Sequence, residues 1–111
     1  MTMAAAPPTM PVPAAMGPRV FACRVRGYAL IGDCIYDGDV VLIDPDRPPA
    51  EGDLAAVTIT WNGQRGRVLR RLGPHGWTLL SSNPDYPPLR LARENNPVAD
   101  GLAVAVIHRL K

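Results

Sequence analysis

The chain has 111 residues, enough for one domain with a modest hydrophobic core. Its 12 basic and 10 acidic residues leave a formal net charge of +2 at pH 7, a balance that gives no reason to expect binding to nucleic acid or to a membrane surface. No apolar run reaches the roughly 18 residues that span a bilayer, and the N-terminus lacks the basic start and continuous apolar stretch of a signal peptide. We therefore expect a cytoplasmic protein.

The two cysteines, Cys23 and Cys34, are too few for a disulfide framework. The sequence has no CxxC motif and no cluster of cysteine and histidine, so it predicts neither a metal site nor a cofactor. We expect both thiols to be reduced and buried.

Residues 1–18 differ from the rest of the chain in composition. They hold five of the 13 prolines and no charged side chain. Each proline removes a backbone donor and fixes φ, so neither a helix nor a sheet can run through this segment. We predict a flexible or polyproline-like arm over residues 1–18 and a folded domain over residues 19–111.

The first half of the predicted domain alternates strands with turns. Residues 19–26 alternate loosely between apolar and polar side chains, which predicts a strand that Gly27 ends. Residues 28–34 are short and mixed and predict one helical or irregular turn. The Asp-Gly-Asp sequence at 37–39 is a turn signal, and the apolar run at 40–43 predicts a buried strand.

The second half opens with a strong hairpin pattern. Residues 54–61 are rich in β-branched side chains, the Asn-Gly pair at 62–63 favours a two-residue turn, and residues 64–72 predict the returning strand. The remaining predicted segments are loops or turns at 46–53, 73–76, 83–88 and 93–101 and strands at 77–82, 89–92 and 102–110.

Six to eight short strands separated by glycine and proline turns predict an all-β domain. We expect twisted antiparallel sheets that are partly barrel-like, with at most one short helical turn. The sequence contains no amphipathic helix pattern of useful length.

Several short motifs follow one another in an order similar to that of a known family. They are Gly-Tyr-Ala-Leu at 27–30, Asp-Gly-Asp at 37–39, Glu-Gly-Asp at 51–53, Asn-Pro-Asp-Tyr-Pro at 83–87 and Gly-Leu-Ala-Val-Ala-Val-Ile at 101–107. In this order and spacing they resemble the C-terminal domain of the LexA/UmuD family, over about residues 20–110. The resemblance implies the fold of that domain, in agreement with the all-β prediction.

The resemblance also implies a site of known chemistry. Members of the family cut their own chain, or another copy's, with a serine that attacks and a buried, neutral lysine that removes its proton. Ala29 occupies the serine's place and has no hydroxyl. Either Leu69 or Arg70 occupies the lysine's place, and neither side chain accepts a proton. We therefore expect a pseudo-peptidase, not an enzyme, with Ala29, Leu69 and Arg70 as its degenerate site.

No other serine or lysine is expected to restore this chemistry. Ser81 and Ser82 are the only serines and are predicted to lie far from the site, and the only lysine is the last residue, Lys111. The nearest candidate for a cleavage bond upstream, Met16-Gly17, lies only 12 residues before the alanine of the reactive turn.

A thiol nucleophile is the remaining alternative. Cys34 follows the reactive turn and Cys23 precedes it, but a cysteine nucleophile needs a base such as histidine. Neither His75 nor His108 has an obvious orienting carboxylate in the sequence. The carboxylates of the 37–39 motif are expected to fix their turn by hydrogen bonds rather than to act as a catalytic pair.

One hairpin carries the candidate surface for a partner. Arginines cluster on its returning strand, and a tryptophan lies beside its Asn-Gly turn. Arginine and tryptophan are enriched where interfaces bind most strongly, although a solvated arginine face and a half-buried tryptophan are the plainer interpretations. The candidate partner-binding residues are Trp61, Arg65, Arg67 and Arg71.

The closing strand is the candidate surface for a second copy of the chain. Residues 102–108 are expected at or near a sheet edge, and an exposed apolar edge must be covered or paired. A two-fold copy is the simplest cover. The predicted dimer-interface residues are Leu102, Val104, Val106 and His108.

Three functions remain open. The first is a non-catalytic LexA/UmuD-like module that dimerises and binds a protein partner, in DNA-damage (SOS) or phage-related regulation. The second is a structural or accessory assembly protein, of a phage for example, that uses the arm at 1–18 for interaction. The third is a peptidase with altered chemistry. We expect the first: a homodimer with an unidentified protein partner, no membrane, no cofactor, and nucleic-acid binding only through a separate DNA-binding domain.

Overall fold

The computed structural model describes residues 17–74, 77–108 and 110. Its strands are β1 (Phe21–Arg24), β2 (Val40–Asp44), β3 (Leu54–Trp61), β4 (Gln64–Leu72), β5 (Thr78–Leu80), β6 (Leu89–Arg90) and β7 (Val98–Ile107). Two 3-10 turns, η2 (Ile31–Asp33) and η3 (Arg93–Asn95), complete the described elements. The all-β prediction is confirmed, with one helical turn more than predicted. Most of the arm predicted at 1–18 lies outside the described residues.

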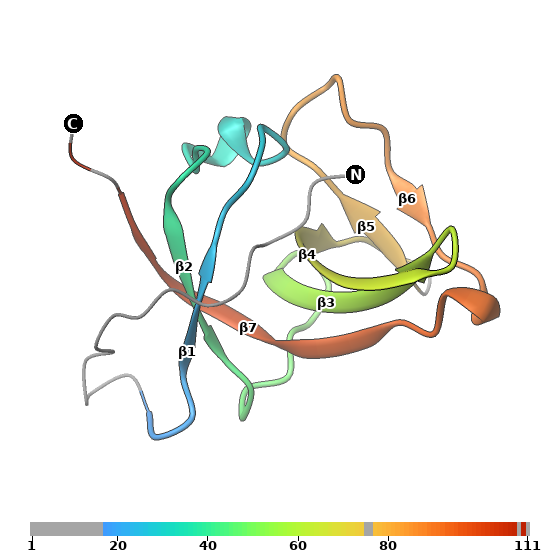
Figure 1. The fold of residues 1–111 in the computed structure, drawn as a ribbon, viewed down its shortest axis with the longest axis horizontal. Helices are drawn as coiled ribbons and strands as arrows, with labels where there is room; N and C mark the ends of the chain where they lie inside the picture. The colour runs from blue at the N-terminus through green and yellow to red at the C-terminus, as the bar shows by residue number, and fades with distance from the viewer. Residues whose placement is uncertain (1–16, 75–76, 109, 111) are drawn as a thin grey trace.

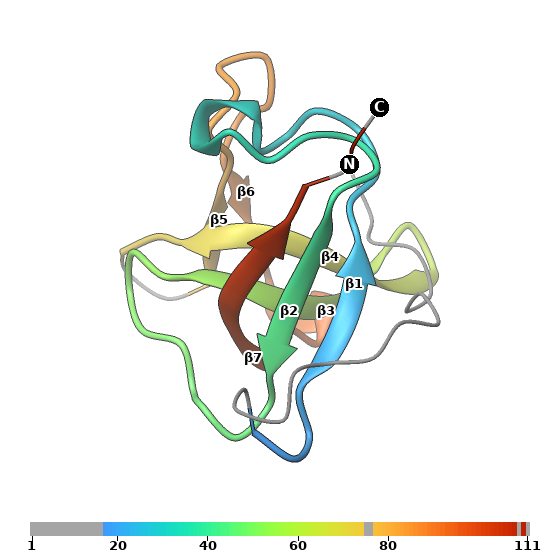
Figure 2. The same ribbon diagram turned by 90° about the vertical axis from the view of Figure 1, so that its left-hand side faces the viewer.

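The strands form one antiparallel sheet in the order β1-β2-β7-β3-β4-β5-β6. The end strands of this order, β1 and β6, do not pair with each other, so the described sheet is open. Figure 1 shows β7 as the long strand that crosses the molecule between the two groups of strands. In the view of Figure 2, β1, β2 and the end of β7 run side by side across the direction of β3 and β4.

The main core lies between these crossing layers. Cys23 and Ile43 of the front layer belong to the same buried cluster as Leu54, Ala56 and Leu69 of the layer behind. The predicted apolar strand at 40–43 is buried on both faces as β2, which explains its unbroken run of apolar side chains.

The hairpin between β3 and β4 has the predicted bounds of both strands. Asn62 and Gly63 have φ values of 51° and 78°, the positive values that a two-residue hairpin turn of the primed type requires. The turn thereby sets the register of β4, in which Leu69 pairs with Ala56 and Arg70 pairs with Ala55.

β7 begins four residues before the predicted closing strand. The segment predicted as a loop over 93–101 contains η3 and the first residues of β7, which pair with β3 as far as Leu102. From Leu102 onward β7 pairs with β2 instead. The prediction at 93–101 was wrong because Asn-Pro and Asp-Gly are turn signals, whereas long-range pairing with β3 decides the local structure here.

Candidate functional site

The reactive-type turn between β1 and β2 is fixed by the carboxylates of its acidic motif. The Gly27 amide donates to Asp37 Oδ1 at 2.7 Å, and the Tyr36 amide donates to Asp39 Oδ2 at 2.8 Å. Gly27 has a φ of 87°, in the left-handed region that favours glycine. The prediction that the two aspartates fix their turn is confirmed.

Ala29 is buried, with 1% of its surface exposed, and its carbonyl is the acceptor for two serines. The Ser82 amide donates to the Ala29 oxygen at 3.1 Å, and the Ser81 hydroxyl donates to the same oxygen. The prediction that Ser81 and Ser82 lie far from the site was therefore wrong. They are 52 and 53 residues further along the chain, and only the packing of the β5–β6 connection against the turn brings them there.

The two serines have structural partners. Ser81 Oγ also accepts the Asn83 amide at 3.0 Å, and Ser82 Oγ accepts the Asp33 amide at 3.1 Å. Gly32 lies against the same segment so closely that a Cβ built on it would stand 2.3 Å from the Ser82 carbonyl oxygen. The hydroxyls thus join the turn to the β5–β6 connection.

Asn83 completes this junction. The sequence pattern predicted a turn at Asn83 but not its contact with the glycine-led turn. Its side chain is buried, and its amide nitrogen donates to the Tyr28 carbonyl at 3.0 Å. Its Oδ1 accepts the Asp85 amide at 3.0 Å, and its carbonyl accepts the Tyr86 amide at 2.9 Å. The Asn-Pro pair was the available signal, because asparagine commonly bonds its own backbone two residues on.

The structure separates the two candidates for the lysine position. Leu69 points into the apolar cluster between the layers, together with Leu30 and Val41. Arg70 is the next residue of the strand and so lies on the opposite face, where its guanidinium stands 5.9 Å from the ring centroid of Tyr86. Tyr86 belongs to the same connection that holds Ala29, whereas Leu69 shares its cluster with Leu30, the neighbour of Ala29 in the chain. The two candidates therefore lie on opposite faces of β4, and each packs against a segment that adjoins Ala29.

Arg70 is a buried cation without an acidic partner among the described residues. Only 3% of its surface is exposed, and its one hydrogen bond to the described protein runs from Nη1 to the Leu69 carbonyl at 2.8 Å. Burial lowers the pKa of the Arg70 guanidinium, and Tyr86 offsets part of that change. The side chain nevertheless remains a cation and not a base, because a guanidinium keeps its proton far above neutral pH.

The other arginines of β4 do not form one exposed patch. Arg67 pairs with Asp100 at 2.9 Å and lies over the Phe21 ring at 4.7 Å. Arg71 pairs with Asp33 at 3.0 Å. Only Arg65 is exposed, with a hydrogen bond to Thr60 at 2.9 Å. The predicted partner surface therefore keeps Arg65, and beside it the partly exposed Trp61.

The thiols differ from each other. Cys23 is buried, as predicted, but Cys34 is exposed, so the expectation of two buried cysteines was wrong for Cys34. His108 Nδ1 lies 2.8 Å from Asp39 Oδ2, so His108 does have an orienting carboxylate, contrary to the sequence analysis. No hydrogen bond joins Cys34 to His108 in the described part of the chain, and the sulfur instead lies beside Tyr36. His75 lies outside the described residues.

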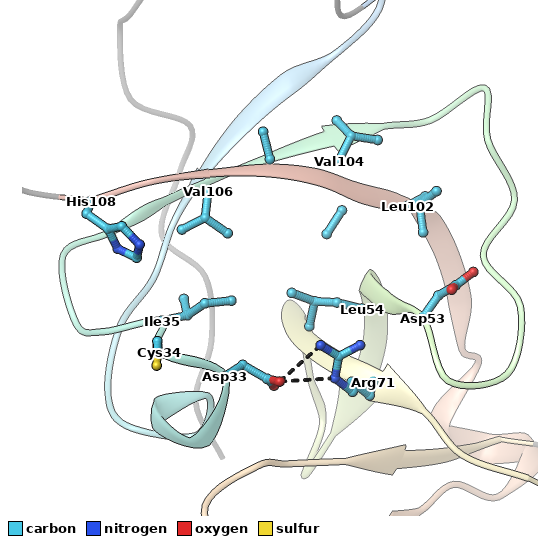
Figure 3. A pocket seen from close by; sticks show the side chains of 12 residues that line it. Asp33, Cys34, Ile35, Asp53, Leu54, Arg71, Leu102, Val104, Val106 and His108 are labelled. Carbon is cyan, nitrogen blue, oxygen red and sulfur yellow. Dashed lines mark hydrogen bonds and ion pairs between the residues drawn. The ribbon is translucent and has the colours of Figure 1, made fainter.

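A groove of about 440 Å³ follows the end of β7. Figure 3 shows Leu102, Val104, Val106 and His108 along one side of it, with Leu54 and the Asp33–Arg71 ion pair opposite. Across residues 17–74, 77–108 and 110, β7 beyond Leu102 pairs with β2 on one side and with no strand on the other. β7 is central in the sheet order, but its second half, beyond Leu102, has a described strand on one side only. This half is the predicted edge.

The four predicted interface residues do not share one face of β7. The pairing with β2 shifts register between Leu42 and Ile43, where Ala105 and Ala103 are their partners. Val104 lies at this irregularity and packs against the cluster of Ala22 and its neighbours, whereas Val106 packs against the main core. A strict alternation of side chains along 102–108 would have put Val104 and Val106 on the same side.

Among the described residues, no group of three or more histidine, cysteine, aspartate or glutamate side chains is arranged to hold a metal ion. Their only helices are the two 3-10 turns, and none is long and apolar enough to cross a membrane.

The sheet is open and antiparallel, and its glycine-led turn is hydrogen-bonded to the Asn-Pro turn. These features define the class of domain that the sequence motifs predicted. The family model for "Peptidase S24-like" proteins matches residues 3–102. A LexA repressor of Delftia acidovorans is 33% identical over 88 residues, which cover 78% of this chain and 38% of the relative. A LexA repressor of Pseudomonas aeruginosa is 33% identical over 101 residues, which cover 87% and 48%. One of Deinococcus radiodurans is 34% identical over 76 residues, which cover 67% and 35%.

The chain belongs to the Peptidase S24-like family, so the resemblance to the LexA/UmuD C-terminal domain is confirmed. It spans less than half the length of the LexA repressors that it matches.

Proposed function

We propose that this chain is a non-catalytic member of its family that dimerises and binds a protein partner. The observation that carries the proposal is the pair of residues at the degenerate site. Ala29 has no hydroxyl with which to attack a carbonyl. Of the two residues at the lysine's place, Leu69 has no group that accepts a proton and Arg70 holds its proton.

The nearby hydroxyls do not replace the missing serine in this proposal. Ser81 donates to the Ala29 carbonyl and accepts the Asn83 amide, so its proton and one of its lone pairs are in use. A serine becomes a nucleophile only when a neighbouring base takes its proton, and the cation of this face is Arg70. The thiol alternative lacks contact between Cys34 and His108.

The retained fold supports recognition as its use. No described strand pairs with the groove side of β7 beyond Leu102, and such an edge is a template for another strand. In a dimer with a two-fold axis, this edge of one copy pairs with the same edge of the other copy, so a single surface of the chain is sufficient. We place Leu102, Val104, Val106 and His108, which line the groove, in this homodimer interface.

Regulation by protein contact is the setting in which we place this module. The relatives carry the name LexA repressor, which favours a role in DNA-damage or phage-related regulation in the cytoplasm. The described residues contain no α-helix, hence no helix-turn-helix, so contact with nucleic acid would come from a separate domain. Trp61 and Arg65 are the exposed members of the proposed partner surface.

The dimer is tested by a charge placed in the groove. Val106→Lys should weaken self-association by about tenfold or more, because the ammonium would lose water on burial at the interface. Val98→Lys is the matched control, since Val98 is 48% exposed at the other end of β7 and does not line the groove. Sedimentation equilibrium over a range of concentrations measures both. A monomeric parent chain, or equal weakening by the two variants, would refute the proposed interface.

A further inference from the structure

Arg70 presents an energetic problem that the proposed loss of catalysis does not explain. A buried ion loses its hydration, and that loss is costly unless an opposite charge or several hydrogen bonds replace it. Among the described residues Arg70 has one hydrogen bond and one aromatic contact, and it forms no ion pair. The three other arginines that form ion pairs here are all more exposed. Arg70 is thus buried and has no counter-charge among the described residues, whereas these three more exposed arginines each have one.

The free side of the guanidinium opens into a pocket. Arg70 lines a hollow of about 340 Å³, whose other walls are Trp61, Asp85, Tyr86, Pro87 and Leu89. The only fully buried side-chain polar atom without a partner in the described chain is Asp33 Oδ2, so Nε and Nη2 of Arg70 are not sealed inside the protein. Arg70 thus retains donors that are not fully buried, in the wall of a pocket whose other residues are mostly apolar.

We propose that this pocket binds a carboxylate carried by an apolar segment of the partner protein, with Arg70 as its anchor. The inference rests on the proposed function, because it gives a recognition role to Arg70, one of the two candidates for the lysine's place. A guanidinium presents two parallel N–H groups that match the two oxygens of a carboxylate. The rings of Trp61 and Tyr86, with Pro87 and Leu89, provide the apolar surface for the group that bears it.

The charges of the pocket favour a carboxylate over a phosphate. One guanidinium balances one negative charge, and Asp85 already places a carboxylate in the wall. A phosphate group on a side chain carries about −1.5 to −2 at pH 7 and would meet repulsion from Asp85 without a second cation. Neither of the other pockets described around the sheet has Arg70 or Trp61 in its wall.

Trp61 provides a signal inside the pocket. The chain has two tryptophans, and Trp77 lines a different pocket, so Trp77→Phe leaves Trp61 as the only indole. Two probes represent the two sources of a carboxylate on a protein: N-acetyl-leucine for a C-terminus and the α-amide of N-acetyl-glutamate for an acidic side chain. The references are N-acetyl-leucinamide and inorganic phosphate. We expect saturable binding of one or both carboxylates with a dissociation constant of about 1–10 mM, the range for ligands of this size, and at least about tenfold weaker binding of the amide.

Charge-matched variants assign the binding to Arg70. In the Trp77→Phe chain, Arg70→Met should abolish saturation, and Arg26→Met, which removes an exposed arginine that lines none of the three pockets described, should leave the dissociation constant unchanged. Arg70→Lys keeps the positive charge but lacks the two parallel N–H groups of the guanidinium, so it should weaken binding about tenfold. This variant provides the test if Arg70→Met does not fold. Asp85→Asn should tighten binding. The Nε–H resonance of Arg70 should shift in parallel with the Trp61 emission.

The inference is overturned if neither carboxylate saturates, if phosphate binds more tightly than both, or if Arg70→Met binds as well as its parent. Its failure is distinct from failure of the proposed function. A monomeric or self-cleaving chain would refute the proposed function whatever the titration shows, whereas an uncleaved dimer without carboxylate binding would refute only the role of Arg70.

Discussion

Asn83 is the buried side chain that joins the degenerate turn to the β5–β6 connection, and its other polar atom, Oδ1, accepts the Asp85 amide within that connection. Asn83→Ala removes both bonds and leaves the Tyr28 carbonyl with only the 3.5 Å bond from the Ile31 amide. We expect the free energy of unfolding to fall by about 1–3 kcal/mol, measured by urea denaturation. Asp85→Ala, at an exposed position of the same turn, should change it by less than about 0.5 kcal/mol. Equal effects of the two substitutions would show that the junction does not depend on the asparagine.

The two thiols should react at different rates. Burial raises the pKa of the Cys23 thiol, and the Arg67 guanidinium offsets part of that rise, so less thiolate is present at a given pH in the folded chain. Cys34 is exposed. Iodoacetamide at mildly alkaline pH should therefore alkylate Cys34 at least about tenfold faster, followed by peptide mass mapping. In urea the two rates should converge, and faster modification of Cys23 in the folded chain would contradict its burial.

At the scale of residues, the sequence predicted which chemical groups are missing but not what surrounds them. Ala29 and the pair Leu69 and Arg70 could be identified because the motifs before and after them fix their places in the chain to within one residue. The contact of Ser81 with the Ala29 carbonyl could not be predicted, because it depends on how two segments 52 residues apart pack together. The placement of Leu69 and Arg70 on opposite faces required the register of β4, which decides the face on which each side chain lies.

At the scale of elements, β7 connects the two layers of the sheet, because it pairs first with β3 and then with β2. Gly101 lies where β7 leaves β3 and joins β2, and a Cβ built on it would stand 2.5 Å from the Asp44 carbonyl oxygen. Gly101→Ala should therefore push the strands apart and lower the free energy of unfolding by about 1–3 kcal/mol. Thermal unfolding followed by circular dichroism measures the change. An unchanged midpoint would mean that the two backbones are not in close contact at this point.

Elements with a local signal were predicted to the residue, and elements that depend on distant partners were not. β3 and β4 have the predicted bounds because the Asn-Gly turn and the β-branched run act within the hairpin itself. The start of β7 was missed because its pairing with β3 joins segments about 40 residues apart. The register shift opposite Leu42 was missed for the same reason, and it placed Val104 and Val106 on different faces.

On the scale of the whole molecule, the open sheet provides two separate recognition surfaces. The groove along β7 is lined by the interface residues of the proposed dimer, and the Arg70 pocket lies on the opposite face of β4 from Arg71, which lines that groove. One surface can therefore hold a second copy while the other holds a partner. The fold that served proteolysis in the family is kept, in this account, because both surfaces need it.

The central claim is that this fold is retained without peptide-bond hydrolysis, and the intact mass of the purified chain tests it most directly. The chain is incubated for a prolonged period at alkaline pH, with and without a RecA-type filament, and then weighed by mass spectrometry. We predict a single species of unchanged mass under every condition, because Ala29 offers no nucleophile and Arg70 no base. Two fragments whose masses add up to that of the chain plus one water would contradict the account.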